Sequence, residues 1–228
     1  MSEWQVEHST GAAHDFHHRD LSSVDRPSVW VHRVERPALV LGSSQRADIV
    51  DRVEADRLGI EVCQRRSGGG LVLVDPSASC WVDVLIPPSS PRWDDDVNRA
   101  FHGVGDVWLR ALESLGVPGL SMHTGSLVDA EAGRFLCFAG LGPGEIVQAT
   151  PAGPSKVVGL SQRRQRNIAR FQGLFVAHTD LALTTSLVDP GAIPHAFDSS
   201  LLRIGLDRPP DPDQVADAVV RVLCDDLS

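Results

Sequence analysis

Short apolar runs separated by brief turns dominate the sequence between residues 29 and 177. Such runs are typical of β-strands, and the turns between them are rich in glycine and proline. Parallel neighbours need a connection of a dozen residues or more, so strands joined this briefly pair mainly antiparallel. We therefore predict an α/β (α+β) fold, with a mixed, largely antiparallel β-sheet flanked by helices. The expected strands cover residues 29–34, 38–41, 61–66, 71–74, 81–86, 135–139, 145–148, 156–161 and 171–177.

Three segments have helical rather than strand periodicity. Residues 46–58 and 97–115 place apolar side chains on one face, and three aspartates at 94–96 precede the longer segment, where they favour a helix N-terminus. A last helix is expected to open at Asp211, an N-cap residue followed by a proline in the first turn. These helices would cover the faces of the sheet.

Length and charge restrict the class of protein. With 228 residues and 42% hydrophobic content, we expect one domain over 1–228, with no C-terminal accessory domain. A net charge of -9 argues against nucleic acid and anionic membranes as partners. Residues 1–20 are polar and histidine-rich, unlike a signal peptide, and no apolar run reaches the roughly 18 residues of a membrane span, so a cytoplasmic location is expected. The four cysteines show no metal-like spacing, and no metal site is predicted.

A glycine-rich loop is the densest local signal for function. Three consecutive glycines are costly in backbone entropy, and an ordinary turn does not require them, whereas close approach of the backbone to a ligand would. Such a loop can direct N–H groups and arginine charge toward carboxylate or phosphate oxygens. A flexible loop with solvated arginines is the alternative. The loop consists of Arg65, Arg66, Ser67, Gly68, Gly69 and Gly70.

Lys156 is the second signal, because it is the single lysine among 21 basic residues. It stands at the head of an expected strand, where an ammonium could project into a cleft and meet a carboxylate or phosphate. Chance retention of one exposed lysine is the alternative. The stretch 163–170 is locally basic, which suits either a solvated face or a docking patch for an acidic partner.

Both signals together resemble a known family. The run RRSGGGLV at 65–72 is similar to the RRxGGGxV signature of lipoate-protein ligase A and its octanoyltransferase relatives, and KVVGLSQRR at 156–164 is similar to their K[IV]xGxxQRR signature. Cys137 and Phe138 resemble the Cys-Phe pair that precedes this lysine in many members. The three motifs occur in the family's order within residues 29–188.

The resemblance implies the biotin/lipoate ligase catalytic fold and an enzyme that attaches a lipoyl or octanoyl group to a lysine of a lipoyl domain. The acceptor would belong to a dehydrogenase complex or to the H protein of glycine cleavage. In the ligase reading, lipoate is activated as lipoyl-AMP with ATP and Mg2+. Lys156 would contact the acyl carbonyl or the adenylate phosphate, and the remaining acyl- or nucleotide-binding residues would be the glycine loop with Gly159, Ser161, Gln162 and Arg163.

Three alternatives remain open from the sequence. Cys137 matches the nucleophile of one class of octanoyltransferases, which take octanoate from acyl carrier protein and need no cofactor. The family's His-His-Gly or Gln-His-Gly run is replaced by Phe171, Gln172 and Gly173, so a catalytically inactive acyl-binding module is the second alternative. A biotin-protein ligase is the third, disfavoured because its Gly-Arg-Gly-Arg loop is not present at 65–70.

Overall fold

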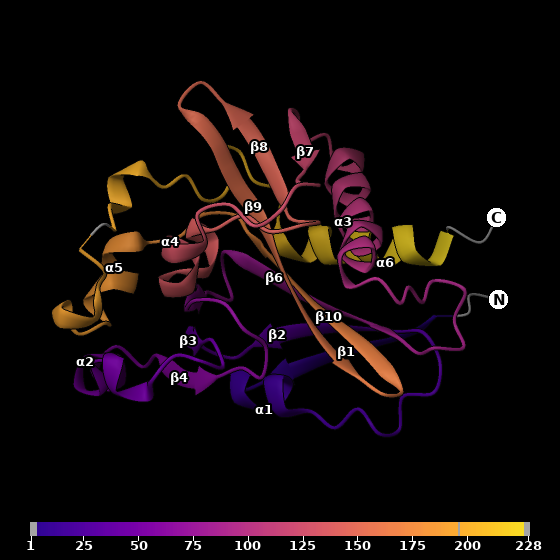
Figure 1. Ribbon diagram of the computed structural model, residues 1–228, viewed down its shortest axis with the longest axis horizontal. Coiled ribbons are helices and arrows are strands. Elements are labelled where there is room, and N and C mark those ends of the chain that lie inside the picture. The colour runs from indigo at the N-terminus through magenta and orange to yellow at the C-terminus, as the bar shows by residue number, and fades with distance from the viewer. Residues whose placement is uncertain (1–3, 196, 226–228) are drawn as a thin grey trace.

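A seven-stranded sheet forms the centre of the chain in a computed structural model that describes residues 4–195 and 197–225 (Figure 1). Its strand order is β1-β2-β6-β10-β9-β8-β7, and only the outer pair β1 and β2 is parallel. The strands are β1 (Gln5–Gly11), β2 (Ser28–Val34), β6 (Ser79–Ile86), β7 (Leu120–Met122), β8 (Ile146–Thr150), β9 (Gly153–Gln165) and β10 (Ile168–Val176). The predicted mixed, largely antiparallel sheet is confirmed.

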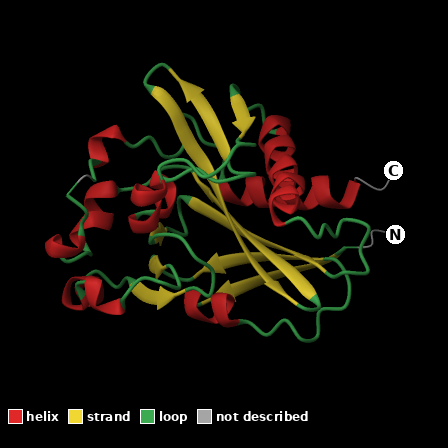
Figure 2. Cartoon of the chain, in the orientation of Figure 1, coloured by secondary structure: helices red, strands yellow, loops and turns green. Residues whose placement is uncertain are grey.

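A second, three-stranded sheet in the order β4-β3-β5 packs beside the first (Figure 2). It consists of β3 (Ala38–Leu41), β4 (Glu61–Gln64) and β5 (Val72–Val74), with β3 parallel to β4. The glycine loop connects β4 to β5, and so this small sheet determines where the loop lies.

Helices cover both faces of the large sheet. The two longest, α3 (Val97–Ser114) and α6 (Pro212–Asp225), pack against each other and against one face. The Asp96 carboxylate caps α3, and Asp211 accepts a hydrogen bond from the backbone N–H of Asp213 at the start of α6, as predicted. The shorter helices are α1 (Ala13–His18), α2 (Arg52–Arg57), α4 (Ala130–Phe135) and α5 (Leu181–Ser186), with single 3-10 turns at η1 (Ala47–Ile49), η2 (Cys137–Ala139), η3 (Pro190–Ala192) and η4 (Ser199–Leu201).

Strand β6 shows why the two faces of the large sheet carry different side chains. Its side chains alternate, because successive residues of a strand point to opposite faces. Val82 and Val84 pack into the core under α3 and α6. Trp81 and Asp83 point to the other face, where Trp81 packs with Phe138. That other face, covered by the small sheet, α1 and η2, carries the candidate site.

Two predicted elements are wrong. The segment 46–58 is not one helix: Val50 leaves the helical path to pair with Val188, and the Asp51 carboxylate caps a new helix, α2. Residues 135–139 are not a strand but the end of α4 followed by η2. A short unbroken apolar run has no period that separates a strand from a buried helical turn, which explains the second error.

The N-terminal segment contains two elements that the sequence did not indicate, β1 and α1. Residues 1–3 of it lie outside the described residues. Helix α1 crosses from β1 to the parallel β2 and places Phe16 and His17 in the interior. Among the described residues, no helix has the length and apolar character needed to cross a membrane.

Candidate active site

The glycine loop folds against the chain segment that leads into Cys137. The N–H of Gly70 donates to the Gly133 carbonyl (2.8 Å), and a Cβ on Gly70 would lie 2.5 Å from the Phe135 carbonyl carbon. Gly69 has φ of +97°, a conformation that side chains disfavour. Gly68 has open space around it. Packing therefore requires glycine at position 70, and the backbone conformation favours it at position 69. At position 68, a side chain would meet no steric obstacle.

The two arginines of the loop point in different directions. Arg65 is buried, and its guanidinium donates to the carbonyls of Gly68 and Gly70 (2.9 Å each) and to Sγ of Cys137 (3.6 Å). Arg66 is exposed. Ser67 Oγ donates to Ser161 Oγ (3.1 Å), which ties the loop to β9. Arg65 thus organises the loop from within and brings a positive charge to the Cys137 thiol.

Lys156 is buried, and each of its three N–H donors has a protein acceptor. Nζ lies 3.0 Å from the Cys137 carbonyl, 2.8 Å from the Gly140 carbonyl and 2.6 Å from Oε2 of Glu145. The lysine therefore does not project freely into a cleft. A ligand oxygen can reach Nζ only by replacing one of these partners.

Glu145 completes this arrangement, although nothing in its sequence surroundings marks it as a site residue. Its buried carboxylate also accepts the backbone N–H of Gly142 (2.7 Å) and that of Leu160 (3.0 Å). The ammonium and the two N–H groups together form a complete site for a carboxylate, which Glu145 occupies. Glu145 directly precedes β8, and the pairing of β8 with β9 brings it to Lys156, which no local sequence pattern indicates.

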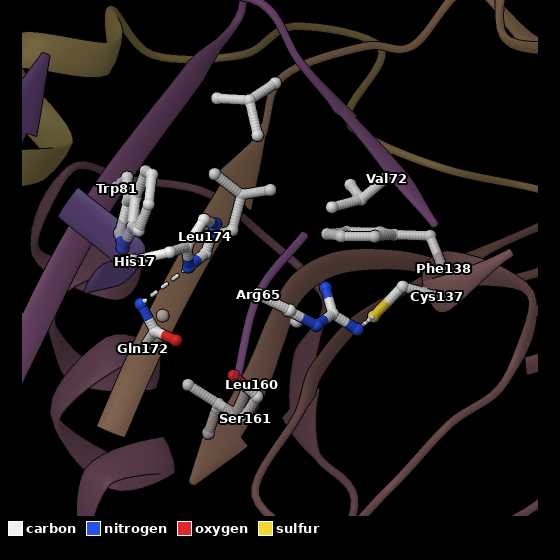
Figure 3. Close-up of a pocket in the computed structure, with 13 residues that line it drawn as sticks. His17, Arg65, Val72, Trp81, Cys137, Phe138, Leu160, Ser161, Gln172 and Leu174 are labelled. Atoms are coloured by element: carbon white, nitrogen blue, oxygen red, sulfur yellow. Dashed lines mark hydrogen bonds between the residues drawn. The ribbon is translucent and has the colours of Figure 1, made fainter. Parts of the chain in front are cut away.

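Two cavities meet at Cys137, and Figure 3 shows residues that line the first of them. The apolar cavity has a volume of about 40 Å³, and its wall includes Val72, Phe138 and Leu174. The glycine-loop cavity has a volume of about 230 Å³, and its wall includes Gly68, Gly69, Arg134, Glu145 and Lys156. Both cavities share part of their walls, namely Arg65, Cys137, Leu160 and Ser161. The Cys137 thiol and the Arg65 guanidinium therefore lie where the apolar cavity joins the one lined by Lys156 and Glu145.

The predicted site residues divide into two groups. Seven of them line one or both cavities: Arg65, Gly68, Gly69, Cys137, Lys156, Gly159 and Ser161. The other five line neither: Arg66, Ser67, Gly70, Gln162 and Arg163. Ser67 and Gly70 hold the loop in place. Burial lowers the pKa of Arg163, and the charge of the nearby Arg66 lowers it further, so these two arginines lie close together.

The side of the apolar cavity opposite Cys137 is formed by His17, Gln172 and Trp81 (Figure 3). Gln172 Nε2 donates to Nδ1 of His17 (3.3 Å), whose ring packs against Trp81 at 4.4 Å between centroids. Trp81 Nε1 donates away from the cavity, to Asp83 (2.8 Å). Trp81 is therefore both buried core and cavity wall.

Asp83 lies behind this wall as a fully buried carboxylate. It is paired with Arg170 and hydrogen-bonded to Nε2 of His32 (3.0 Å). Burial alone would raise the pKa of Asp83, but the charges of Arg170 and His32 and their hydrogen bonds outweigh it and hold the pKa well below its ordinary value. Arg170 also donates to the Phe16 carbonyl (2.5 Å), so this ion pair anchors α1, and with it His17, to the sheet.

Burial lowers the pKa of His17 from 6.5 to about 3, and the nearby charge of Asp83 only partly opposes this. Because the folded protein binds the proton more weakly than the unfolded chain, the stability contribution of the neutral ring is complete above pH 6.5 and is lost as the pH falls toward 3. Between pH 6.5 and 4.5 the wild type should lose about 2 kcal/mol through this group.

We expect His17→Phe to lose correspondingly less stability over that window, as measured by urea unfolding at pH 7 and at pH 4.5. His8→Gln, which changes an exposed histidine on β1, is the matched control and should behave as the wild type does. Equal losses of unfolding free energy in His17→Phe and the wild type would contradict the assignment of this pH effect to His17.

Comparison with known proteins gives one family and one fold. Residues 11–223 match the family model described as the lipoyl protein ligase A/B catalytic domain. Among solved structures, a bipartite lipoate protein ligase from Thermoplasma acidophilum, described with its E2 lipoyl domain, is similar with a TM-score of 0.70 and 17% identity, over 99% of this chain and 84% of that one.

Two further structures have the same fold. A putative lipoate protein ligase from T. acidophilum with bound lipoic acid gives a TM-score of 0.65 at 17% identity, covering 98% and 85% of the two chains. Lipoate-protein ligase A bound with ATP gives a TM-score of 0.68 at 19% identity, covering 98% of this chain and 84% of that one. No curated protein matches the sequence.

Proposed function

The chain belongs to the lipoyl protein ligase A/B catalytic-domain family, and from this premise we propose that it is a protein-acylating enzyme that attaches a lipoyl or octanoyl group to a lysine of a lipoyl domain. One observation carries the proposal: an apolar cavity opens beside Cys137 onto a second cavity lined by Lys156 and Glu145. An acyl chain in the first would place its carbonyl carbon where the two cavities join.

Lys156 would act on the carbonyl oxygen. Acyl transfer to an amine develops negative charge on that oxygen, and a fixed ammonium stabilises it. Of the three acceptors around Nζ, two are backbone carbonyls held by their own chain, whereas the Glu145 side chain can rotate away. The substrate oxygen would therefore replace Glu145 on Nζ.

In the ligase route, the acyl carboxylate displaces pyrophosphate from ATP, and the acceptor amine then displaces AMP from the acyl-adenylate. The glycine-loop cavity supports this route, since Lys156, the exposed Arg134 and the backbone around Gly68 face it and could contact phosphate oxygens. Among residues 4–195 and 197–225, no three His, Cys, Asp or Glu side chains gather as a metal site. In this route Mg2+ would be held mainly by nucleotide phosphates and water.

In the transferase route, the Cys137 thiolate attacks the thioester carbonyl of octanoyl-acyl carrier protein and releases the carrier thiol. The acceptor amine then attacks the Cys137 thioester and releases the enzyme thiol. The position of Cys137 favours this second candidate, because Sγ borders both cavities and lies 3.6 Å from a guanidinium nitrogen of Arg65.

The acceptor or carrier would approach over a basic region. His14, His18, Arg66 and Arg163 lie near one another, since His14, Arg66 and Arg163 each add to the effect of burial in lowering the pKa of His18. On a chain with net charge -9, this region offers an acidic domain a local site of opposite charge.

Intact-mass analysis separates the two routes. We expect incubation with octanoyl-carrier protein to give an acyl adduct that is absent from Cys137→Ser and retained by Cys224→Ser, the control for a half-buried cysteine on α6. Acylation of a lipoyl domain that requires ATP and survives Cys137→Ser would select the ligase instead. Failure to acylate authentic acceptors with either donor would overturn the enzyme proposal, and tight acyl binding in that case would favour a binding module.

A further inference from the structure

The apolar cavity is not apolar throughout. On the side opposite Cys137 and Phe138, the wall is formed by the imidazole of His17 and the carboxamide of Gln172 (Figure 3). Both are brought there by the fold: α1 carries His17, and β10 pairs Gln172 with Ser161 on one flank and Asp83 on the other. An acyl chain whose carbonyl lies at Cys137 would extend toward this pair.

The pair has hydrogen-bonding capacity that the protein does not use. Among the described residues, the side chain of Gln172 makes one hydrogen bond, from Nε2 to Nδ1 of His17. Its carbonyl oxygen and its second N–H are left for another partner. Because the amide donates to Nδ1, the imidazole carries its proton on Nε2. Gln172 is only half-buried, so its free groups can reach a molecule in the cavity.

The other polar groups of the cavity already have partners. The Arg65 guanidinium is bonded to two loop carbonyls and to Cys137, and Trp81 Nε1 is bonded to Asp83. Ser161 Oγ accepts from Ser67. His17 is uncharged at neutral pH because burial lowers its pKa to about 3. The far wall therefore suits a neutral polar group and offers no charge to an ionic one.

A purely alkyl chain would be a poor partner for this wall. A methyl end would exclude water from the amide of Gln172 without replacing the lost hydrogen bonds, and an unpaired buried polar group is costly. Sites built to hydrogen-bond a substrate group discriminate strongly against the analogue that lacks it. The sulfur atoms of a lipoyl group are weak acceptors, so a lipoyl end should suit this wall better than a methyl end and less well than a hydroxyl end.

We propose, building on the acyl-transfer function above, that His17 and Gln172 make the enzyme select medium-length acyl groups whose far end carries a neutral hydrogen-bonding group. The expected order of preference is an 8-hydroxyoctanoyl group, then lipoyl, then octanoyl. Among acids of matched length, selection depends on the far end of the chain and not on the carboxyl end.

Calorimetric titration of the wild-type protein with 8-hydroxyoctanoate, lipoate and octanoate tests this order. We expect 8-hydroxyoctanoate to bind about tenfold to a hundredfold more tightly than octanoate. Equal affinities, or tighter binding of octanoate, would overturn the inference while leaving the proposed function in place. Failure of all three acids to bind would also overturn the inference, whereas the proposed function is overturned only if authentic acceptors are not acylated from either donor.

Variants identify the residues responsible. His17→Phe combined with Gln172→Leu should remove the preference, because the double variant should bind 8-hydroxyoctanoate more weakly and octanoate more tightly than the wild type does. Gln165→Leu, at the end of β9 and outside both cavities, is the matched control and should keep the wild-type ratio. An unchanged ratio in the folded double variant would overturn the assignment to these residues. The wild-type comparison is a complete test on its own if that variant does not fold.

Discussion

Replacing Lys156 with methionine is expected to reduce acyl transfer about 100- to 1,000-fold and to lower the free energy of unfolding by about 3–5 kcal/mol. The first effect follows from loss of the donor closest to the developing oxyanion. The second follows because Glu145 would remain buried at 4% exposure with two backbone N–H partners but no counter-charge. Removing one partner of a buried ion pair leaves an uncompensated charge in a poorly solvating interior.

A second substitution separates the two effects. In the double variant Lys156→Met with Glu145→Gln, most of the stability should return, because no unpaired charge is left, while acyl transfer stays low. Urea unfolding and a lipoyl-domain acylation assay measure the two quantities. Arg166→Met, at the exposed β9–β10 turn, controls for loss of one positive charge. Full activity in a folded Lys156→Met protein would contradict the role of the ammonium.

Replacing Gly70 with alanine is expected to cost about 3 kcal/mol of stability and most of the activity. The added Cβ would meet the backbone of Phe135 and the N–H of Leu136, at 2.5 and 2.6 Å, and a backbone cannot rotate aside as a side chain can. The segment displaced in this way leads directly into Cys137, so the thiol would move relative to Lys156. Thermal unfolding and the acylation assay provide the measurements.

Gly68→Ala is the matched control for that change, two residues away in the same loop. A Cβ there meets nothing within 4 Å, and Gly68 does not have positive φ. Its stability should be within about 0.5 kcal/mol of the wild type. Because Gly68 faces the glycine-loop cavity, an activity loss without a stability loss would indicate contact with the acyl donor or the nucleotide. Equal destabilisation by the two alanines would contradict the packing explanation.

The sequence predicted the sheet and the motif-bearing loop because their signals are local. Alternation over 81–86 predicts a strand with two different faces, and β6 has this character. The glycine run predicts that the loop backbone approaches another group closely, and Gly70 does lie against the backbone of Phe135. What it approaches depends on which segment the fold brings there, and no local pattern contains that information.

The polar partners inside the site could not be predicted for the same reason. His17 belongs to a short helix without periodicity, and it reaches the cavity only because β1 and β2 are parallel and α1 crosses between them. Glu145 is a single acidic residue beside a turn, and its importance comes from the pairing of β8 with β9. Both residues depend on tertiary structure rather than on their neighbours in sequence.

The burial of Lys156 also leaves the protein's own surface without an accessible lysine amine for the species it would handle. An activated acyl group reacts with any deprotonated amine, and surface lysines supply most such amines in ordinary proteins. Here the single lysine of the sequence is 5% exposed and ion-paired, and the other twenty basic residues are arginines, which stay protonated and are not acylated. Apart from its α-amino group, the chain offers a stray acyl group no accessible amine, so an acceptor lysine on the proposed partner domain would face little competition from the enzyme's own amines.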